Sequence, residues 1–307
     1  MTTNKSRRPR GFTLVEMLVV IAIIGVLAAI LVPTLYRVVI KARQTRIAQE
    51  MSELHKAMES YKQKFGDYPP DFTTLTGPAD LTDQNHLVVR HLRKAFPRLA
   101  ENLPSVFNDG SGNLDKPNPA EALVFWLGQL WNDPRKPLTG SGELTTLFPF
   151  DEKRLIKTRT IGTGTAQRDL YVYVPPDGKN APYVYFDSRV YTNAKPIPGS
   201  SPPVAIASLC VYKDAAGTEL LYPYATKRNN APVDPVTNPL TMPNPTTFQI
   251  ISAGLDGDYG DVTSVIAGDP TTYKVFPFGD NYQIGDWDNI SNFSVGGDGT
   301  IFEDHMK

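Results

Sequence analysis

One stretch near the N-terminus decides the fold: RGFTLVEMLVVIAIIGVLAAILVP, residues 10–33. From Phe12 to Val32 this stretch is apolar apart from Thr13 and Glu16. As an α-helix the run would be about 30 Å long, which matches the hydrocarbon core of a bilayer. The sequence therefore predicts a helix that spans a membrane once.

Basic charge precedes this run, and an acid lies inside it. The charged side chains before Gly11 are all basic. A cleaved secretory signal has a shorter apolar stretch of roughly 7–15 residues. An ordinary anchor leaves Glu16 without a role, although a carboxylate inside a membrane helix costs roughly 2.5–3.5 kcal/mol. Cleavage between Gly11 and Phe12 would explain the acid, because the new ammonium of one subunit could pair with Glu16 of its neighbour.

The sequence RGFTLVEML (residues 10–18) resembles the processing site of type IV prepilins and type II secretion prepseudopilins. The resemblance implies that a prepilin peptidase removes a cytoplasmic leader, residues 1–11, by cutting after Gly11, and that Phe12 is N-methylated. It also implies that the helix over residues 12–33 forms the filament core, with the family's common kink at Pro33 and with Glu16 acting in assembly.

The same resemblance implies partners and a location. The partners would be other copies of the chain or related subunits, the membrane, the peptidase, an assembly ATPase and a platform protein. Basic residues lie on both sides of the span, so the positive-inside rule gives no orientation. A single pass through the bacterial inner membrane, with the globular domain in the periplasm, follows from the resemblance alone.

The helix is predicted to continue as an amphipathic segment over residues 34–66. Apolar residues recur at alternating spacings of four and three, which places them on one helical face. They are Ile47, Met51, Leu54, Met58, Tyr61 and Phe65. Gly66, followed by Pro69 and Pro70, predicts the end of the helix. A coiled coil would give the same stripe, but the stripe is short, so we expect it to pack on the chain's own domain.

Residues 67–307 are predicted to form the extracytoplasmic domain, and 71–246 are mostly an insertion relative to the minimal domain of the family. Helices are expected over residues 85–103 and 119–131. Strands are expected over residues 170–174, 183–186, 205–212 and 247–251, and loops over 193–203 and 229–245. This order predicts the α+β class: a long N-terminal transmembrane helix whose C-terminal half packs on an antiparallel sheet, as in the pilin-like fold.

A calcium site is implied by a second, looser resemblance, to the loop of major pseudopilins. Its parts are IISAGLDG (residues 250–257) and DWDNI (residues 286–290). Carried over, the carboxylate ligands would be Asp256, Asp286 and Asp288, and Leu255 and Ser252 would offer backbone oxygens. Calcium takes 6–8 oxygen ligands, which Asp- and Gly-rich loops supply. The same Asp-Gly pairs also make turns without a metal.

Other classes of function find little support. The formal charge of −1 gives no reason to expect nucleic acid, and the single cysteine, Cys210, excludes an intramolecular disulfide. The sequence has no nucleophile elbow, zinc-binding helix pair or phosphate loop, so we expect no enzyme and no cofactor other than Ca²⁺. The sequence favours a pseudopilin of type II secretion. The alternatives are a major or minor type IV pilin, or a membrane-tethered protein that binds cargo or glycan through its insertion.

Overall fold

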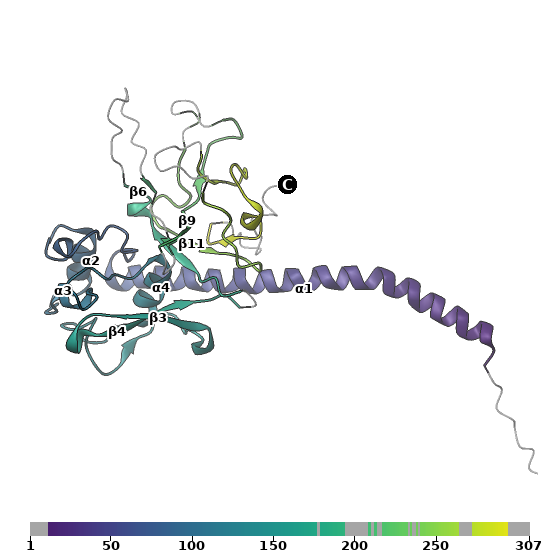
Figure 1. The fold of residues 1–307 in the computed structure, drawn as a ribbon, viewed down its shortest axis with the longest axis horizontal. Helices are drawn as coiled ribbons and strands as arrows, with labels where there is room; N and C mark the ends of the chain where they lie inside the picture. Colours follow the sequence, from purple (N-terminus) through teal and green to yellow (C-terminus); the bar gives the residue numbers. More distant parts are fainter. Residues whose placement is uncertain are drawn as a thin grey trace, which may run out of the picture. The chain divides into compact units, whose positions relative to one another are not determined.

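The computed structural model describes residues 12–176, 179–193, 208–209, 212–213, 217–232, 234, 238, 240–263 and 272–293. The chain forms two compact units, Met1–Arg43 and Gln44–Lys307. One helix, α1 (Leu14–Phe65), runs through the boundary between them (Figure 1). The predicted long helix is thereby confirmed. The leader with Gly11 lies outside the described residues, and the predicted domain limits stay predictions.

The C-terminal part of α1, from Gln44 to Phe65, belongs to the second unit and buries one face there. Its fully buried side chains include those at the predicted 4-3 spacing: Ile47, Met51, Leu54, Met58 and Tyr61. Burying each such side chain contributes about 1.5–3 kcal/mol. The stripe therefore packs within the chain's own domain, as expected.

Gly66 ends α1. Its φ of 91° lies in the left-handed region, and its N–H donates to the carbonyl of Lys62 at 2.7 Å. A residue with a Cβ is strained in this conformation, whereas glycine is not. The helix exit then leads directly into the globular unit, because the buried Trp126 donates its indole N–H to the carbonyl of Pro70 at 2.8 Å.

Short helices follow, where one longer helix over residues 85–103 was predicted. The structure has η1 (Pro78–Leu81), α2 (Leu87–Ala95) and α3 (Leu103–Val106). The prediction was right for α2 and wrong beyond it. Phe96 precedes Pro97 and has φ −129° and ψ 80°, because a residue before proline is driven out of the helical region.

Helix α4 (Pro119–Gly128) is the central element of the second unit and contacts β4 and β5, whose bounds are given below. Asn118 caps it by accepting from the N–H groups of Ala120 and Glu121, and the Glu121 carboxylate accepts from the Asn118 N–H at 2.8 Å. This reciprocal capping box fixes the start of the helix. The predicted end at Trp131 was wrong: Leu130–Trp131 form strand β1, paired with β2 (Leu144–Thr145).

The strands make several small sheets. The hairpin of β3 (Leu155–Ile161) and β4 (Arg168–Tyr173) is antiparallel, and β11 (Phe248–Ser252) lies between β5 (Val184–Asp187) and β13 (Ile290–Ser291), antiparallel to both. These strands confirm the α+β class and the predictions for residues 170–174, 183–186 and 247–251, whereas β3 was not predicted. Short helical turns are η2 (Glu152–Arg154), η3 (Gly164–Ala166), η4 (Ser188–Val190) and η6 (Ile284–Asp286).

Two-residue and three-residue strands complete the described structure. The antiparallel pairs are β6 (Thr192–Asn193) with β7 (Ser208–Leu209) and β8 (Tyr212–Lys213) with β9 (Glu219–Leu221), and β10 (Ala225–Thr226) pairs in parallel with β12 (Val275–Phe276). The strand predicted over residues 205–212 falls only partly within the described residues, and Cys210 lies outside them, as do residues 194–203 of the first predicted loop.

Candidate functional site

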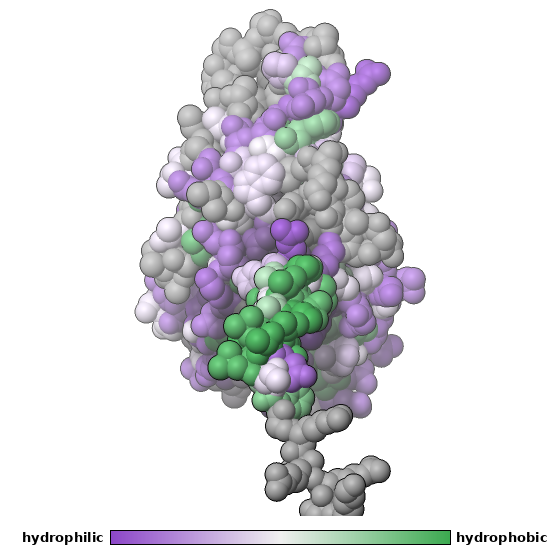
Figure 2. All heavy atoms as spheres, turned by 90° about the vertical axis from the view of Figure 1, so that its right-hand side faces the viewer, coloured by the Kyte–Doolittle hydropathy of each residue, from purple (hydrophilic) through white to green (hydrophobic). Residues whose placement is uncertain are grey.

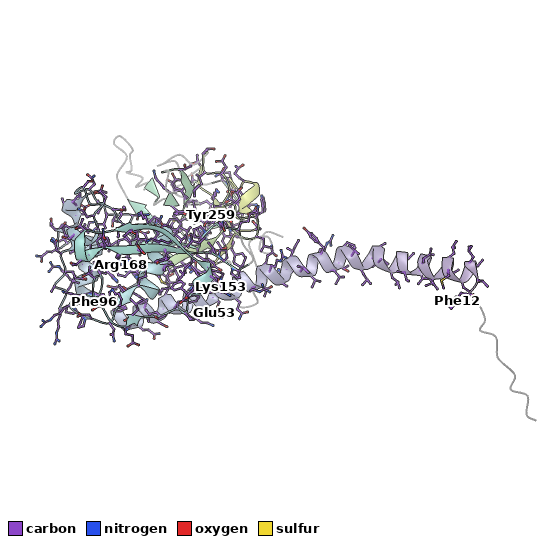
Figure 3. The ribbon with its side chains drawn as sticks, turned by 60° about the horizontal axis from the view of Figure 1, so that its bottom comes forward. Phe12, Glu53, Phe96, Lys153, Arg168 and Tyr259 are labelled. Atoms are coloured by element: carbon purple, nitrogen blue, oxygen red, sulfur yellow. The ribbon has the colours of Figure 1, made fainter. Side chains whose placement is uncertain are left out.

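The first candidate site is the free end of α1. Phe12 is the first described residue and 75% exposed, and it lies at the start of the helix (Figure 3). From here to Val39 the apolar side chains of α1 stay exposed, and Figure 2 shows them as a hydrophobic surface. α1 is long and apolar enough to cross a membrane by length and composition.

Glu16 makes a capping box with Thr13 at the start of α1. The backbone N–H of Thr13 donates to Glu16 Oε2 at 2.8 Å, and the N–H of Glu16 donates to Thr13 Oγ1 at 3.2 Å. Two N–H groups that no helical carbonyl can accept are satisfied in this way. The sequence contains the signal for this cap, Thr-x-x-Glu before an apolar run, although no cap was predicted. In the single subunit Glu16 therefore has a local partner as well as the predicted role in assembly.

Pro33 lies inside α1, and the helix continues through it. Proline has no N–H to donate to the preceding turn. The carbonyl of Ala29, four residues before Pro33, therefore lacks its helical donor, and the Thr34 hydroxyl donates to a different carbonyl, that of Leu31, at 2.8 Å. Pro33 is thus a position where the backbone bonding of the helix is locally weaker.

The second candidate site is the acidic loop that follows β11. Asp288 Oδ2 accepts the N–H groups of Leu255 and Asp256 at 2.8 and 3.2 Å, which fastens the loop onto the later segment. Burial, together with the smaller effect of the neighbouring Asp256 carboxylate, raises the pKa of Asp288 to about 6. Among the described residues, Asp288 Oδ1 and Ser252 Oγ are buried without a hydrogen-bond partner. The carboxylates of Asp256 and Asp288 thus lie next to each other, and Asp288 Oδ1 could still accept a bond from a ligand.

Asp286, the third predicted ligand, has partners different from those of Asp256 and Asp288. It is buried and forms an ion pair with the buried Lys274, Nζ to Oδ1 at 2.7 Å. Tyr224 donates its hydroxyl to the same oxygen at 2.8 Å, and the N–H of Gln283 donates to the other. Lys274 also donates to the carbonyl of Tyr259 at 3.0 Å. The carboxylate of Asp286 is thus already neutralised by the ammonium of Lys274. No sequence signal near Asp286 predicted this ion pair.

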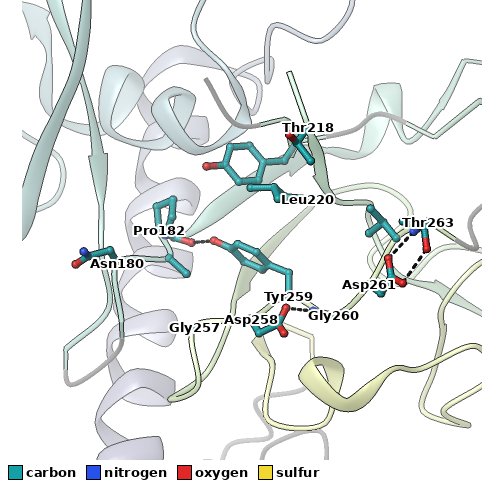
Figure 4. Close-up of a pocket in the computed structure, with 13 residues that line it drawn as sticks. Asn180, Pro182, Thr218, Leu220, Gly257, Asp258, Tyr259, Gly260, Asp261 and Thr263 are labelled. Carbon is teal, nitrogen blue, oxygen red and sulfur yellow. Dashed lines mark hydrogen bonds between the residues drawn. The ribbon is translucent and has the colours of Figure 1, made fainter. Parts of the chain in front are cut away.

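A cavity of about 510 Å³ lies beside the acidic loop. Figure 4 shows Tyr259 in its wall, where its hydroxyl donates to the carbonyl of Pro182. Asp258 and Asp261, the further acids of the loop, each accept from a backbone N–H two residues on, those of Gly260 and Thr263. In the described part of the chain, no three carboxylate, imidazole or thiol groups converge as metal ligands. The geometry brings together Asp256 and Asp288 and leaves Asp286 with Lys274.

Comparisons with known proteins match the chain at the first candidate site, the N-terminal part of α1. The model of the prokaryotic N-terminal methylation motif matches residues 6–32. The chain is 41% identical over 63 residues to the type II secretion system core protein G of Klebsiella pneumoniae, which is 20% of this chain and 45% of that protein. It is 42% identical over 76 residues to core protein G of Escherichia coli K12, covering 25% and 50% of the two chains.

A pilin is also similar. The type IV major pilin protein PilA of Myxococcus xanthus is 36% identical over 64 residues, 20% of this chain and 29% of that protein. The chain thus matches half or less of the length of these relatives, and no solved structure matches it significantly. The N-terminal region carries the methylation motif and is similar to that of type IV pilin-like proteins. Within them, it is similar both to the pseudopilin core protein G and to a major pilin.

Proposed function

We propose that this chain is a structural subunit, a pseudopilin, of a type II secretion pseudopilus. The observation that carries the proposal is the exposed apolar part of α1, headed by Phe12 and Glu16 and matched by the methylation motif. A surface of this kind is stable only in lipid or against other apolar helices. The subunit moves between these two environments when it leaves the bilayer and joins the filament.

The mechanism is one of assembly rather than catalysis. A prepilin peptidase cuts after Gly11 and Phe12 is methylated, which leaves a cationic amine at the start of the helix. That amine and Glu16 of a neighbouring subunit form an ion pair in an apolar phase, where each offsets the desolvation of the other. The pair fixes the axial register of the subunits. The capping bonds of Glu16 to Thr13 hold its carboxylate at the helix start before assembly.

The subunit is anchored in the inner membrane, with the second unit in the periplasm. An assembly ATPase and a platform protein supply the work of extraction, which an apolar helix of this length requires. The similarity to core protein G favours secretion, and the similarity to PilA keeps a type IV pilus as the second candidate. Deletion of the gene tests the choice: we expect secreted proteins to accumulate in the periplasm. Loss of surface pili with normal secretion would support the pilin instead.

We further propose that Asp256 and Asp288 bind Ca²⁺ in the acidic loop. Two adjacent carboxylates, one of them half-buried and neither paired with a base among the described residues, fit a divalent cation. Asp288 Oδ1 accepts no hydrogen bond there. The backbone oxygens of Ser252 and Leu255 would complete part of the shell. When bound, the ion supplies charge neutralisation that closes the loop. Asp286 is left out of the set, because Lys274 already neutralises it.

A further inference from the structure

Assembly through the N-terminal helix does not explain the large insertion over residues 71–246. A second cavity lies in this insertion. It measures about 440 Å³ and lies between the β1–β2 pair and the β3–β4 hairpin. This volume is in the range of small-molecule sites. The wall mixes flat aromatic rings with hydroxyl, amide and charged groups, among them Gln129, Trp131, Thr139, Thr160, Arg168 and Tyr171.

Two charged side chains, Arg168 and Asp169, line this cavity, and Arg168 is its cation. Its guanidinium lies over the ring of Phe125, with 4.1 Å to the centroid. It donates to the carbonyls of Gln129 and Leu138 at 2.9 and 3.2 Å. These bonds use two of its five N–H groups, and its Nε is buried without an acceptor among the described residues. Burial lowers the pKa of Arg168 to about 10, against the weaker opposing effect of the Glu101 carboxylate.

The acids near Arg168 are engaged elsewhere. Asp169 pairs with Lys157 at 2.8 Å and accepts from the Thr160 hydroxyl. Glu101 accepts from the N–H groups of Leu138 and Thr139 and from the Thr139 hydroxyl. Within the described residues no carboxylate forms an ion pair with Arg168. A half-buried cation without an anionic partner carries an uncompensated desolvation cost, so the cavity favours an anion.

The rest of the wall indicates which anion. Trp131 and Tyr171 are half-buried and offer apolar ring faces with polar edges. Gln129 Oε1 has no hydrogen-bond partner in the described structure. Three threonines line the same cavity, Thr139, Thr160 and Thr165. A sugar ring has matching features, an apolar C–H face and a hydroxyl edge. A carboxylate on that ring suits guanidinium, which binds carboxylates through paired N–H groups. We propose that this cavity binds a sugar acid, a hexuronate unit of an acidic polysaccharide.

The test uses the full-length protein in detergent micelles, titrated by calorimetry with digalacturonate, with neutral methyl glucoside and with acetylglycine. Digalacturonate should bind about tenfold or more tightly than either of the others. If methyl glucoside binds as tightly as digalacturonate, the cavity does not recognise the carboxylate of the sugar. Acetylglycine binding as tightly would indicate a peptide chain end. Either result, or no binding of digalacturonate at about 10 mM, overturns the proposal.

Two pairs of variants separate recognition from folding. Arg168→Gln should weaken digalacturonate binding about tenfold or more, the loss expected for a charge-assisted contact, while Arg90→Gln, an exposed position on α2, should not. Leu144 is 40% exposed in the cavity wall, so substitution there spares the core. Leu144→Glu should repel the sugar acid, and Leu144→Gln should keep most of the binding. Equal binding by the two Leu144 variants would contradict the proposal.

Discussion

Arg154, which directly precedes β3, holds Glu50 of α1 through both carboxylate oxygens. Its Nη1 donates to Oε2 at 2.8 Å, and its Nη2 donates to Oε1. Tyr173 and Tyr183 add their hydroxyls, at 2.9 and 2.8 Å, so that each carboxylate oxygen accepts one guanidinium N–H and one hydroxyl. This cluster fastens the helix to the β3–β4 hairpin within the globular unit, and it lies only a few residues beyond the boundary at Gln44.

Breaking this cluster should destabilise the globular unit. Arg154→Ala leaves Glu50 partly buried without its cation, which should cost about 2–3 kcal/mol in the free energy of unfolding. Urea unfolding of the full chain in micelles, followed by tryptophan fluorescence, measures it. The control is Asp67→Asn, which breaks the exposed pair with Lys94 and should cost under about 1 kcal/mol. Equal losses in both variants would show that the cluster carries no special stability.

Glu16→Ala should block filament incorporation. The variant removes the proposed partner of the Phe12 amine, and it also removes the return bond of the capping box at Thr13. Immunoblots of sheared filaments measure incorporation, and unfolding of the globular unit should be unchanged. Glu53→Ala, an exposed acid farther along α1 (Figure 3), is the matched control. Thr13→Val separates the two roles of Glu16, because it disturbs the cap and leaves the carboxylate. Normal filaments from Glu16→Ala would contradict the assembly role.

Stability should fall in acid because of His91. Burial lowers its pKa to about 3, and its Nε2 lies 2.9 Å from the Tyr61 hydroxyl. The unfolded imidazole takes up a proton below pH of about 6.5 and the folded one does not. The contribution of the neutral His91 imidazole to the free energy of unfolding is therefore fully present above that pH. It is lost as the pH falls toward 3, by about 1.4 kcal/mol per pH unit.

His91→Gln isolates this contribution. The variant should be less stable at pH 7, and its free energy of unfolding should fall less steeply than that of the parent as the pH is lowered from neutral. Arg90→Gln, at an exposed position on the same helix, keeps the buried imidazole and should retain the parental slope. Identical slopes in the parent and His91→Gln would rule out His91 as the source.

Chelation tests the calcium proposal. Removing Ca²⁺ from the full chain should lower the melting temperature by several degrees, as expected for loss of a bound ion. Asp288→Asn should abolish the difference between Ca²⁺ and chelator. Asp261→Asn, an exposed acid of the same loop, should leave it in place. A melting curve that is the same with and without chelator removes the site.

The long helix and its C-terminal end could be predicted because local signals agree there: apolar length, the 4-3 stripe and Gly66. The predictions failed where tertiary contacts override local preference. Leu130–Trp131 continue an apolar helical pattern but pair with β2. Neither the Lys274–Asp286 pair nor the Glu50–Arg154 pair could be foreseen, since the partners of the latter are 104 positions apart and only the fold brings them together.

Whether the mature helix begins with a free amine at Phe12 can be decided by mass spectrometry of the N-terminus of the native protein. We predict a mature chain that begins at Phe12 and carries one N-methyl group. A filament-forming chain that still carries residues 1–11 would contradict the proposed assembly, because no amine would then exist at Phe12 to meet Glu16.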